Sequence, residues 1–148
     1  MKNWKFADFK ANFIEICKKN NACKPEFAKV LVAETAESLL EIVISNIHWC
    51  YKNEIATAEM LDFFGEEMCW ERGLLYRGER SVTNPAFAIF TLGSSQATVE
   101  TLGSSQATVE TWDSSQATVK TLDSSLCRNL TTKKITLKKG DFEIEIIE

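Results

Sequence analysis

The sequence predicts an α+β fold, in which an N-terminal all-α bundle is followed by a short β-solenoid and a C-terminal β-hairpin or capping strands. Two observations predict it. Apolar residues recur at steps of three and four up to about residue 77, which is the helical period. From residue 91 the ten-residue unit TLGSSQATVE is repeated, and self-similarity at a fixed period marks a chain that stacks one short unit on itself.

Two helices are expected first. The polar stretch 18–21 ends the first helix, and proline at position 25 suits the first turn of the second, where its missing N–H costs nothing. The apolar face of the first helix consists of Phe6, Phe9, Phe13, Ile16 and Cys17, and that of the second of Phe27, Val30 and Leu31.

Two further helices complete the expected helical domain, residues 1–78. Thr35, or Glu34, is expected to start the third helix, and Thr57 is expected to cap the fourth. The buried residues are Leu39, Leu40, Val43, Ile44 and Ile47 in the third helix, and Met60, Leu61, Phe64, Met68 and Leu75 in the fourth. Gly65 and Gly73 weaken the fourth helix, and Gly73 is suited to end it. Residues 79–85 are expected to form a linker, with Asn84-Pro85 as a turn signal.

Each decapeptide predicts one short strand and one turn. Ala97 and Val99 alternate with Thr98 and Glu100, so that one side of the strand is apolar. Gly or Asp at positions 93, 103, 113 and 123, followed by Ser-Ser, supplies the turn. Strands stacked about 4.8 Å apart would bury a thin core of Ala, Val and Ser over residues 86–131, about 10 residues per repeat. In this alignment Phe87 lies over Ala97 and Ile89 over Val99.

The spacing leaves two points open. Ten residues form either one full turn or half of a square twenty-residue turn, as in pentapeptide-repeat proteins. We expect the full turn, because the two halves ATVET and LGSSQ are chemically unlike. One large apolar column either fills the core or covers a face against the helical domain: Leu92, Leu102, Trp112 and Leu122.

The last segment, residues 132–148, is expected to close the open end of the stack. ITLKKGDFEIEI contains two alternating strands, and Gly140 suits the left-handed position of a short hairpin loop. An uncapped end would present unpaired backbone groups and invite end-to-end association.

Composition argues against several function classes. The net charge is −4 and neither half of the chain is basic, which argues against nucleic-acid binding. No apolar run is long enough for a signal peptide or a membrane span, so we expect a cytoplasmic protein with no membrane partner. Five cysteines without a CxxC pair predict reduced thiols rather than a disulfide framework or a zinc site. We expect no cofactor and no metal.

No catalytic residues are predicted. His48 is the only histidine, which argues against a triad and favours a structural role, and the paired serines have no base placed near them. Glu66, Glu67 and Glu71 are expected to form a solvated helix face. Cys23 is the candidate reactive thiol, because a helix N-terminus lowers the pKa of a thiol.

The outward side of the strands is the candidate binding surface, and its residues are Thr98, Glu100, Thr108, Glu110, Trp112, Thr118 and Lys120. Regular threonine arrays are also typical of ice-binding solenoids, although the charges at positions 100, 110 and 120 interrupt such a face. A second threonine column is expected at or near a corner: Thr91, Thr101, Thr111, Thr121 and Thr131.

The motif TVETWDSSQATV resembles decapeptide arrays in uncharacterised proteins of bacteria and their phages, where such units follow a small helical region rich in Cys and Trp. NNACKPEF at 20–27, Trp49 and the pair Cys69-Trp70 are similar to that region. The resemblance implies architecture only. We therefore expect a non-enzymatic protein-binding or assembly module that binds a protein partner or a second copy of itself. The alternatives are a small enzyme or reactive-thiol protein around Cys23, His48 and the tryptophans, and an ice-binding-like threonine surface.

Overall fold

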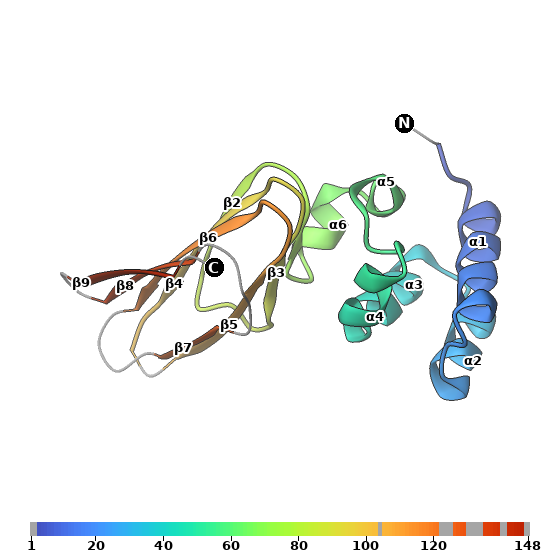
Figure 1. The fold of residues 1–148 in the computed structure, drawn as a ribbon, viewed down its shortest axis with the longest axis horizontal. Coiled ribbons are helices and arrows are strands. Elements are labelled where there is room, and N and C mark those ends of the chain that lie inside the picture. The colour runs from blue at the N-terminus through green and yellow to red at the C-terminus, as the bar shows by residue number, and fades with distance from the viewer. Residues whose placement is uncertain (1–2, 104, 122–125, 130–134, 140–141, 147–148) are drawn as a thin grey trace. The chain divides into compact units, whose positions relative to one another are not determined.

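The computed structural model describes residues 3–103, 105–121, 126–129, 135–139 and 142–146, with side chains as far as Thr121. The chain divides into two compact units, residues 1–69 and 70–148. The helices belong to the first unit, with the last one crossing the boundary, and the strands belong to the second (Figure 1).

The helices in chain order are α1 (Phe6–Lys19), α2 (Lys24–Val32), α3 (Ala36–Ser45), α4 (Ile47–Lys52), α5 (Ala58–Leu61) and α6 (Glu66–Trp70). Three sequence signals fix where helices begin. Pro25 lies in the first turn of α2, as predicted. Thr35 caps α3, where its hydroxyl accepts a hydrogen bond from the Ser38 amide at 3.2 Å. The Thr57 hydroxyl caps α5 by accepting from the Met60 amide at 3.3 Å.

The last two predicted helices are shorter than expected. Ile47 lies in α4 rather than α3, and the fourth helix is divided into α5 and α6. Gly65, at a φ of +84°, separates these two pieces, because a left-handed residue cannot continue a right-handed helix. Gly73, at a φ of +82°, precedes a strand, so Leu75 is a strand residue and not a helical one.

An aromatic cluster around Phe9 forms the core of the helical unit. The Phe9 side chain is fully buried, stacks on Phe63 at 4.3 Å between ring centroids, and meets Phe13 and Phe64 edge to face. The ammonium group of Lys10 joins α1 to the end of α2 by donating to the carbonyls of Leu31 and Ala33. These last carbonyls have no partner within their own helix, so Lys10 stabilises the α2 terminus.

The strands are β1 (Leu74–Leu75), β2 (Glu79–Thr83), β3 (Ile89–Thr91), β4 (Gln96–Thr101), β5 (Gln106–Thr111), β6 (Gln116–Thr121), β7 (Leu126–Asn129), β8 (Ile135–Lys139) and β9 (Phe142–Ile146). They form two sheets, with the orders β1-β3-β5-β7 and β2-β4-β6-β8-β9 (Figure 1). The described pairs are parallel, except that β8 and β9 pair antiparallel.

The predicted fold class, an α+β chain whose ten-residue coils stack as a β-solenoid, is wrong. The structure has helices followed by two sheets, which are parallel apart from the β8–β9 pair, and consecutive decapeptides lie in different sheets. Gln96 is in register with Gln116 and Ile89 with Val109, so paired strands are twenty residues apart. Ala97 and Ala107, which we expected to stack on each other, are not paired.

The turn residues explain why the chain changes sheet after every strand. Gly93, Gly103 and Asp113 all have a positive φ near +60°. Each is the second residue after the end of a strand. A left-handed residue at this point redirects the chain sharply. The carboxylate of Asp113 accepts a hydrogen bond from the Gly93 amide at 3.0 Å, which joins two turns twenty residues apart.

Two expectations at the edges of the repeat region also change. The segment expected as a linker, 79–85, contains β2, which pairs with β4 over its whole length. The strands therefore begin at β1, well before residue 86. The expected turn at 140–141, and Leu122, Asp123 and Thr131 of the repeat columns, lie outside the described residues.

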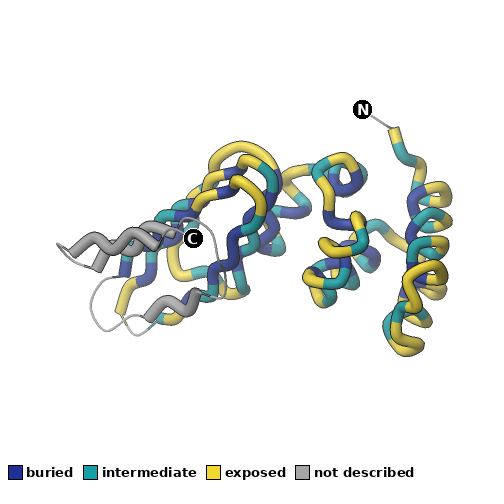
Figure 2. Tube along the Cα trace, viewed as in Figure 1, coloured by how far each residue is buried: buried dark blue, intermediate teal, exposed yellow. Residues whose placement is uncertain are grey.

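Inward-facing residues of both sheets form the core of the second unit: Leu75, Ile89, Ala97, Val99, Ala107, Val109, Ala117 and Val119. Burial alternates along β4 and β6, as Figure 2 shows. Trp70 and Val82 pack against this cluster. Leu92 is buried whereas Leu102 is 36% exposed, because the two positions belong to turns of different strands. The threonines expected at a corner, Thr91, Thr101, Thr111 and Thr121, are buried.

The second serine of the first pair, Ser95, is structural, and we expect its loss to be measurable. The buried Ser95 hydroxyl lies 2.7 Å from the Leu92 carbonyl and 3.1 Å from the Leu75 carbonyl, to which it donates. Ser95→Ala should therefore lower the free energy of unfolding by about 1 kcal/mol. Ser94 is exposed, so Ser94→Ala should change it by less than about 0.5 kcal/mol. Chemical denaturation measures both, and equal effects would contradict this role of Ser95.

Candidate binding surface

The side of β2, β4 and β6 that faces away from the core is polar and partly or fully exposed. We call it the outer face, and it consists of Glu79, Ser81, Thr83, Gln96, Thr98, Glu100, Gln116, Thr118 and Lys120. It arises because successive side chains of a strand point to opposite sides of a sheet. The apolar alternate residues of β4 and β6 enter the core and leave these polar ones outside.

The register arranges the outer face in rows that cross the strands. One row carries hydroxyls, since Ser81 is paired with Thr98 and Thr98 with Thr118. Thr136 of β8 follows Thr118 at the next register position. Neighbouring strands lie about 4.8 Å apart, so hydroxyl-bearing positions recur at that spacing over four strands.

The next row carries charge. Glu100 is in register with Lys120, so a negative and a positive side chain occupy neighbouring positions on β4 and β6. Thr83 precedes Glu100 and Lys138 follows Lys120 in the register. The outer face therefore combines a neutral hydroxyl row with a charged row beside it. The charge changes from negative on β4 to positive on β6, so the two ends of the surface are not equivalent.

An open depression of about 460 Å³ lies where β2 and β4 begin. Its lining comes from Trp70, Glu79, Arg80, Ser81, Gln96 and Thr98. The glutamate and arginine give it charges of both signs, and the tryptophan gives it an apolar edge. Sequence reasoning missed this depression, because residues 79–81 were assigned to a linker and Trp70 to the helical domain.

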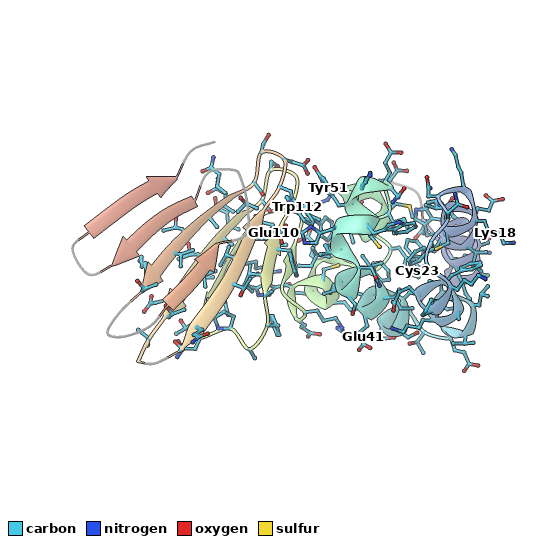
Figure 3. All side chains as sticks on the ribbon, turned by 60° about the horizontal axis from the view of Figure 1, so that its bottom comes forward. Lys18, Cys23, Glu41, Tyr51, Glu110 and Trp112 are labelled. Carbon is cyan, nitrogen blue, oxygen red and sulfur yellow. The ribbon has the colours of Figure 1, made fainter. Side chains whose placement is uncertain are left out.

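The seven residues predicted to form one binding surface are divided between the two sheets. Thr98, Glu100, Thr118 and Lys120 come together on β4 and β6. The other three, Thr108, Glu110 and Trp112, lie on β5 or just after it (Figure 3 labels Glu110 and Trp112). The division follows from the twenty-residue register, whereas we favoured a full turn of ten residues over the twenty-residue alternative.

Glu110 and Trp112 are also less accessible than predicted. Glu110 is only 2% exposed, and its register neighbour on β3 is the aromatic residue Phe90. Trp112 is half-buried and stacks on Phe90, with 6.1 Å between the ring centroids. One ring of the aromatic pair therefore belongs to the register neighbour of Glu110, and this part of β5 is largely buried.

The other candidate residues are found in the helical unit, except Glu71, which lies at the start of the second unit. His48 is an exposed residue of α4, and Glu66 and Glu67 are exposed on α6, with Glu71 exposed just after it. Cys23 is the exposed residue that precedes α2, and Figure 3 shows it in the helical unit. Its side chain lines a small cavity together with Cys17 and Cys50, which are both buried.

Burial changes the acidity of two of these thiols. Burial, with a smaller contribution from the nearby Cys23, raises the pKa of Cys17 to about 11. The same two causes, burial first and the neighbouring Cys17 second, raise the pKa of Cys50 to about 12. Both thiols are therefore protonated at neutral pH, and a protonated thiol is neither a nucleophile nor a metal ligand.

These shifts predict the chemical reactivity of the cysteines. At pH 8 we expect iodoacetamide to modify the exposed Cys23, while Cys17 and Cys50 react only after the chain is unfolded. Mass spectrometry of peptides from the folded and the denatured protein measures this difference. Modification of Cys50 in the folded protein as fast as that of Cys23 would contradict its burial.

The same shifts predict lower stability in alkali. A pKa that is higher in the folded than in the unfolded chain contributes stability below the ordinary value of 9.0, and this stability is lost as pH rises through about 11 and 12. The free energy of unfolding should therefore decrease above pH 9. In Cys50→Ala the decrease should be less steep, by up to about 1.4 kcal/mol per pH unit. Denaturation curves across this range compare the slopes, and identical slopes would contradict the assignment.

No group of three or more His, Cys, Asp or Glu side chains is arranged to hold a metal ion in the part of the chain that the structure describes. Among the same residues, the helices are too short or too polar for any of them to cross a bilayer. No protein-family model, curated protein or solved structure matches this chain.

Proposed function

We propose that this chain is a non-enzymatic binding or assembly protein, and that it recognises a protein partner or a second copy of itself through the outer face. One observation carries the proposal: the register sets Ser81, Thr98 and Thr118 in a row of hydroxyls beside the charged pair of Glu100 and Lys120. Short polar side chains at a regular spacing form a flat surface that can hydrogen-bond to another protein without large side-chain ordering costs.

The charged pair supplies orientation. A partner that places opposite charges against Glu100 and Lys120 is attracted in one direction along the sheet and repelled in the other. The depression bounded by Trp70, Glu79 and Arg80 offers an anchoring point for an aromatic or charged partner side chain. Buried thiols at Cys17 and Cys50 support a reducing, cytoplasmic location for such a protein.

Two substitutions test the outer face. Thr118→Arg places a long charged side chain in the middle of the hydroxyl row, and Lys120→Glu sets two negative charges at neighbouring register positions. Each should weaken binding about tenfold. The arginine side chain holds the partner away from the hydroxyl row, the new glutamate brings two like charges together, and each effect costs about 1.4 kcal/mol or more. Glu41→Lys on α3 is the matched control, since Glu41 is exposed and lies in the other unit.

Sedimentation velocity at increasing protein concentration measures self-association. Where the wild type stays monomeric, a photocrosslinking residue at position 118 captures the partner in cells, with position 41 as the control site. Association and crosslinking that are indifferent to both outer-face substitutions would contradict the proposal. Inhibition of ice recrystallisation that Thr118→Arg abolishes would instead assign the hydroxyl row to ice.

A further inference from the structure

The helical unit contains a small cavity of about 130 Å³ between α1, α2, α3 and α4. Its lining consists of Phe13, Cys17, Ala22, Cys23, Glu26, Phe27, Val30, Ile42, Asn46, Trp49 and Cys50. Most of these side chains are apolar, and Phe13, Cys17, Val30 and Cys50 are at most 4% exposed. Cys23, which precedes α2, is the exposed residue of this lining.

The volume of the cavity limits what it can hold. An apolar cavity of about 150 Å³ excludes water and binds benzene, because water gains too few hydrogen bonds inside it. The cavity here is of similar size, so it matches a single aromatic ring and excludes a drug-sized molecule.

The walls favour an aromatic ring over an aliphatic chain. Phe13, Phe27 and Trp49 contribute aromatic surfaces, against which a further ring can stack or pack edge to face. Cys17 and Cys50 contribute polarisable sulfur atoms, which make favourable contacts with aromatic rings. Because burial raises the pKa of both thiols, they line the cavity as neutral groups rather than as thiolates.

One edge of the cavity is polar and carries a fixed acceptor. The Glu26 carboxylate accepts a hydrogen bond from the Lys29 ammonium at 2.6 Å and another from the Asn46 side-chain amide at 2.8 Å. These two donors lower the pKa of Glu26, so the carboxylate stays ionised at neutral pH. A carboxylate has about four acceptor positions, so these two bonds leave capacity for a further donor.

We propose that this cavity binds a monocyclic aromatic molecule that carries one hydrogen-bond donor, with the ring among Phe13, Phe27 and Trp49 and the donor directed to the Glu26 carboxylate. The site is in the helical unit and goes beyond the outer face, so that either proposal can fail without the other. Asn46 also donates to the Ile42 carbonyl at 3.0 Å, which holds the amide in place beside Glu26.

Phenol and toluene test this inference, because they have the same size and differ only in the donor. Isothermal titration calorimetry on the full chain should show phenol binding at least about fivefold more tightly than toluene, since hydrogen bonds to charged groups are strong. In Glu26→Gln this preference should fall to within about twofold, while toluene binds as before. Glu37→Gln, an exposed glutamate of α3 outside the lining, is the control and should keep the preference.

A second variant tests the location. Ala22→Leu adds side-chain volume inside the cavity and should weaken both probes at least about tenfold, whereas Ala28→Leu adds the same volume on the exposed side of α2 and should not. Amide chemical-shift changes on adding phenol should be confined to residues around the lining, and they identify the site in the wild type even where a variant folds poorly. Absence of binding by both probes, binding unaffected by Ala22→Leu in a folded variant, or shifts confined to other residues would overturn the proposal.

Discussion

Val109→Asp is expected to unfold the second unit. Val109 is fully buried on β5, between the register partners Ile89 and Asn129, and belongs to the core shared by both sheets. A carboxylate there loses its hydration without gaining a hydrogen-bond partner among Ala, Val and Ile side chains. The cost should exceed about 4 kcal/mol, which is comparable to the whole stability of a small domain. Loss of the strand signals in far-UV circular dichroism and in amide NMR spectra measures the effect.

The control lies on the same strand. Gln106 begins β5 and is exposed, so Gln106→Asp should change the free energy of unfolding by less than about 0.5 kcal/mol. Val109→Ala gives an intermediate point, with an expected loss of about 2 kcal/mol from the removed apolar surface. A folded Val109→Asp protein with wild-type spectra would show that β5 does not face the core as described.

Gly73→Ala is expected to cost about 3 kcal/mol or more. Gly73 has a φ of +82°, where an L side chain is disfavoured by about 1–2 kcal/mol. A Cβ at this position would also lie 2.2 Å from the Ala88 carbonyl oxygen and 2.7 Å from the Phe87 ring. Because the first of these atoms belongs to the backbone, the chain around β3 must move. This movement would lengthen or break the 2.7 Å hydrogen bond from the Phe90 amide to the Gly73 carbonyl.

Gly103 separates the two causes of this effect. It has a φ of +63° in the same unit, but a Cβ there would have no atom within 4 Å. Gly103→Ala should therefore cost only the conformational part, about 1 kcal/mol. Urea denaturation of both variants gives the comparison, and equal losses would mean that the close approach of Ala88 to Gly73 has no energetic consequence.

Local features of this fold could be predicted from the sequence because local chemistry determines them. The helix starts at Pro25, Thr35 and Thr57 follow from capping and from the fixed φ of proline. The alternation of buried and exposed residues in β4 follows from the strand period. Gly73 was expected as a candidate helix end, whereas the break at Gly65 was visible only as a weak position, because a glycine in a sequence does not reveal the sign of its φ.

The pairing of the strands could not be predicted in the same way. Residues 91–100 and 101–110 are identical, so strand partners ten and twenty residues away offer the same side chains. The register is decided by the direction in which the turn at Gly93 sends the chain, which depends on packing between the sheets. β2 was missed since ERSVT carries charge at its start and resembles a connection.

The candidate sites show the same contrast. Both the expected ten-residue register and the observed one place Thr98 and Thr118 in one column, but only the observed twenty-residue register makes them direct neighbours, and the same holds for Glu100 and Lys120. The cavity was missed because its lining is scattered over residues 13–50 and contains few polar atoms. The available signal was the presence of Cys17, Cys23 and Cys50 in a segment that also contains Phe13, Phe27 and Trp49. From these cysteines we inferred only reduced thiols and a candidate reactive thiol at Cys23.

The assignment of alternate decapeptides to alternate sheets makes the number of copies a question of parity. Loss of one copy would transfer β6 and the β8–β9 pair to the opposite sheet and would separate Glu100 from a lysine neighbour. Loss or gain of two copies would keep every later strand in the sheet that it now occupies. The identical segments 91–100 and 101–110 together are two copies of the repeat, so their joint loss or duplication is a change of this kind. Recombination between repeats can therefore lengthen or shorten this unit by twenty residues while keeping its pairing, whereas a ten-residue slip rearranges all that follows.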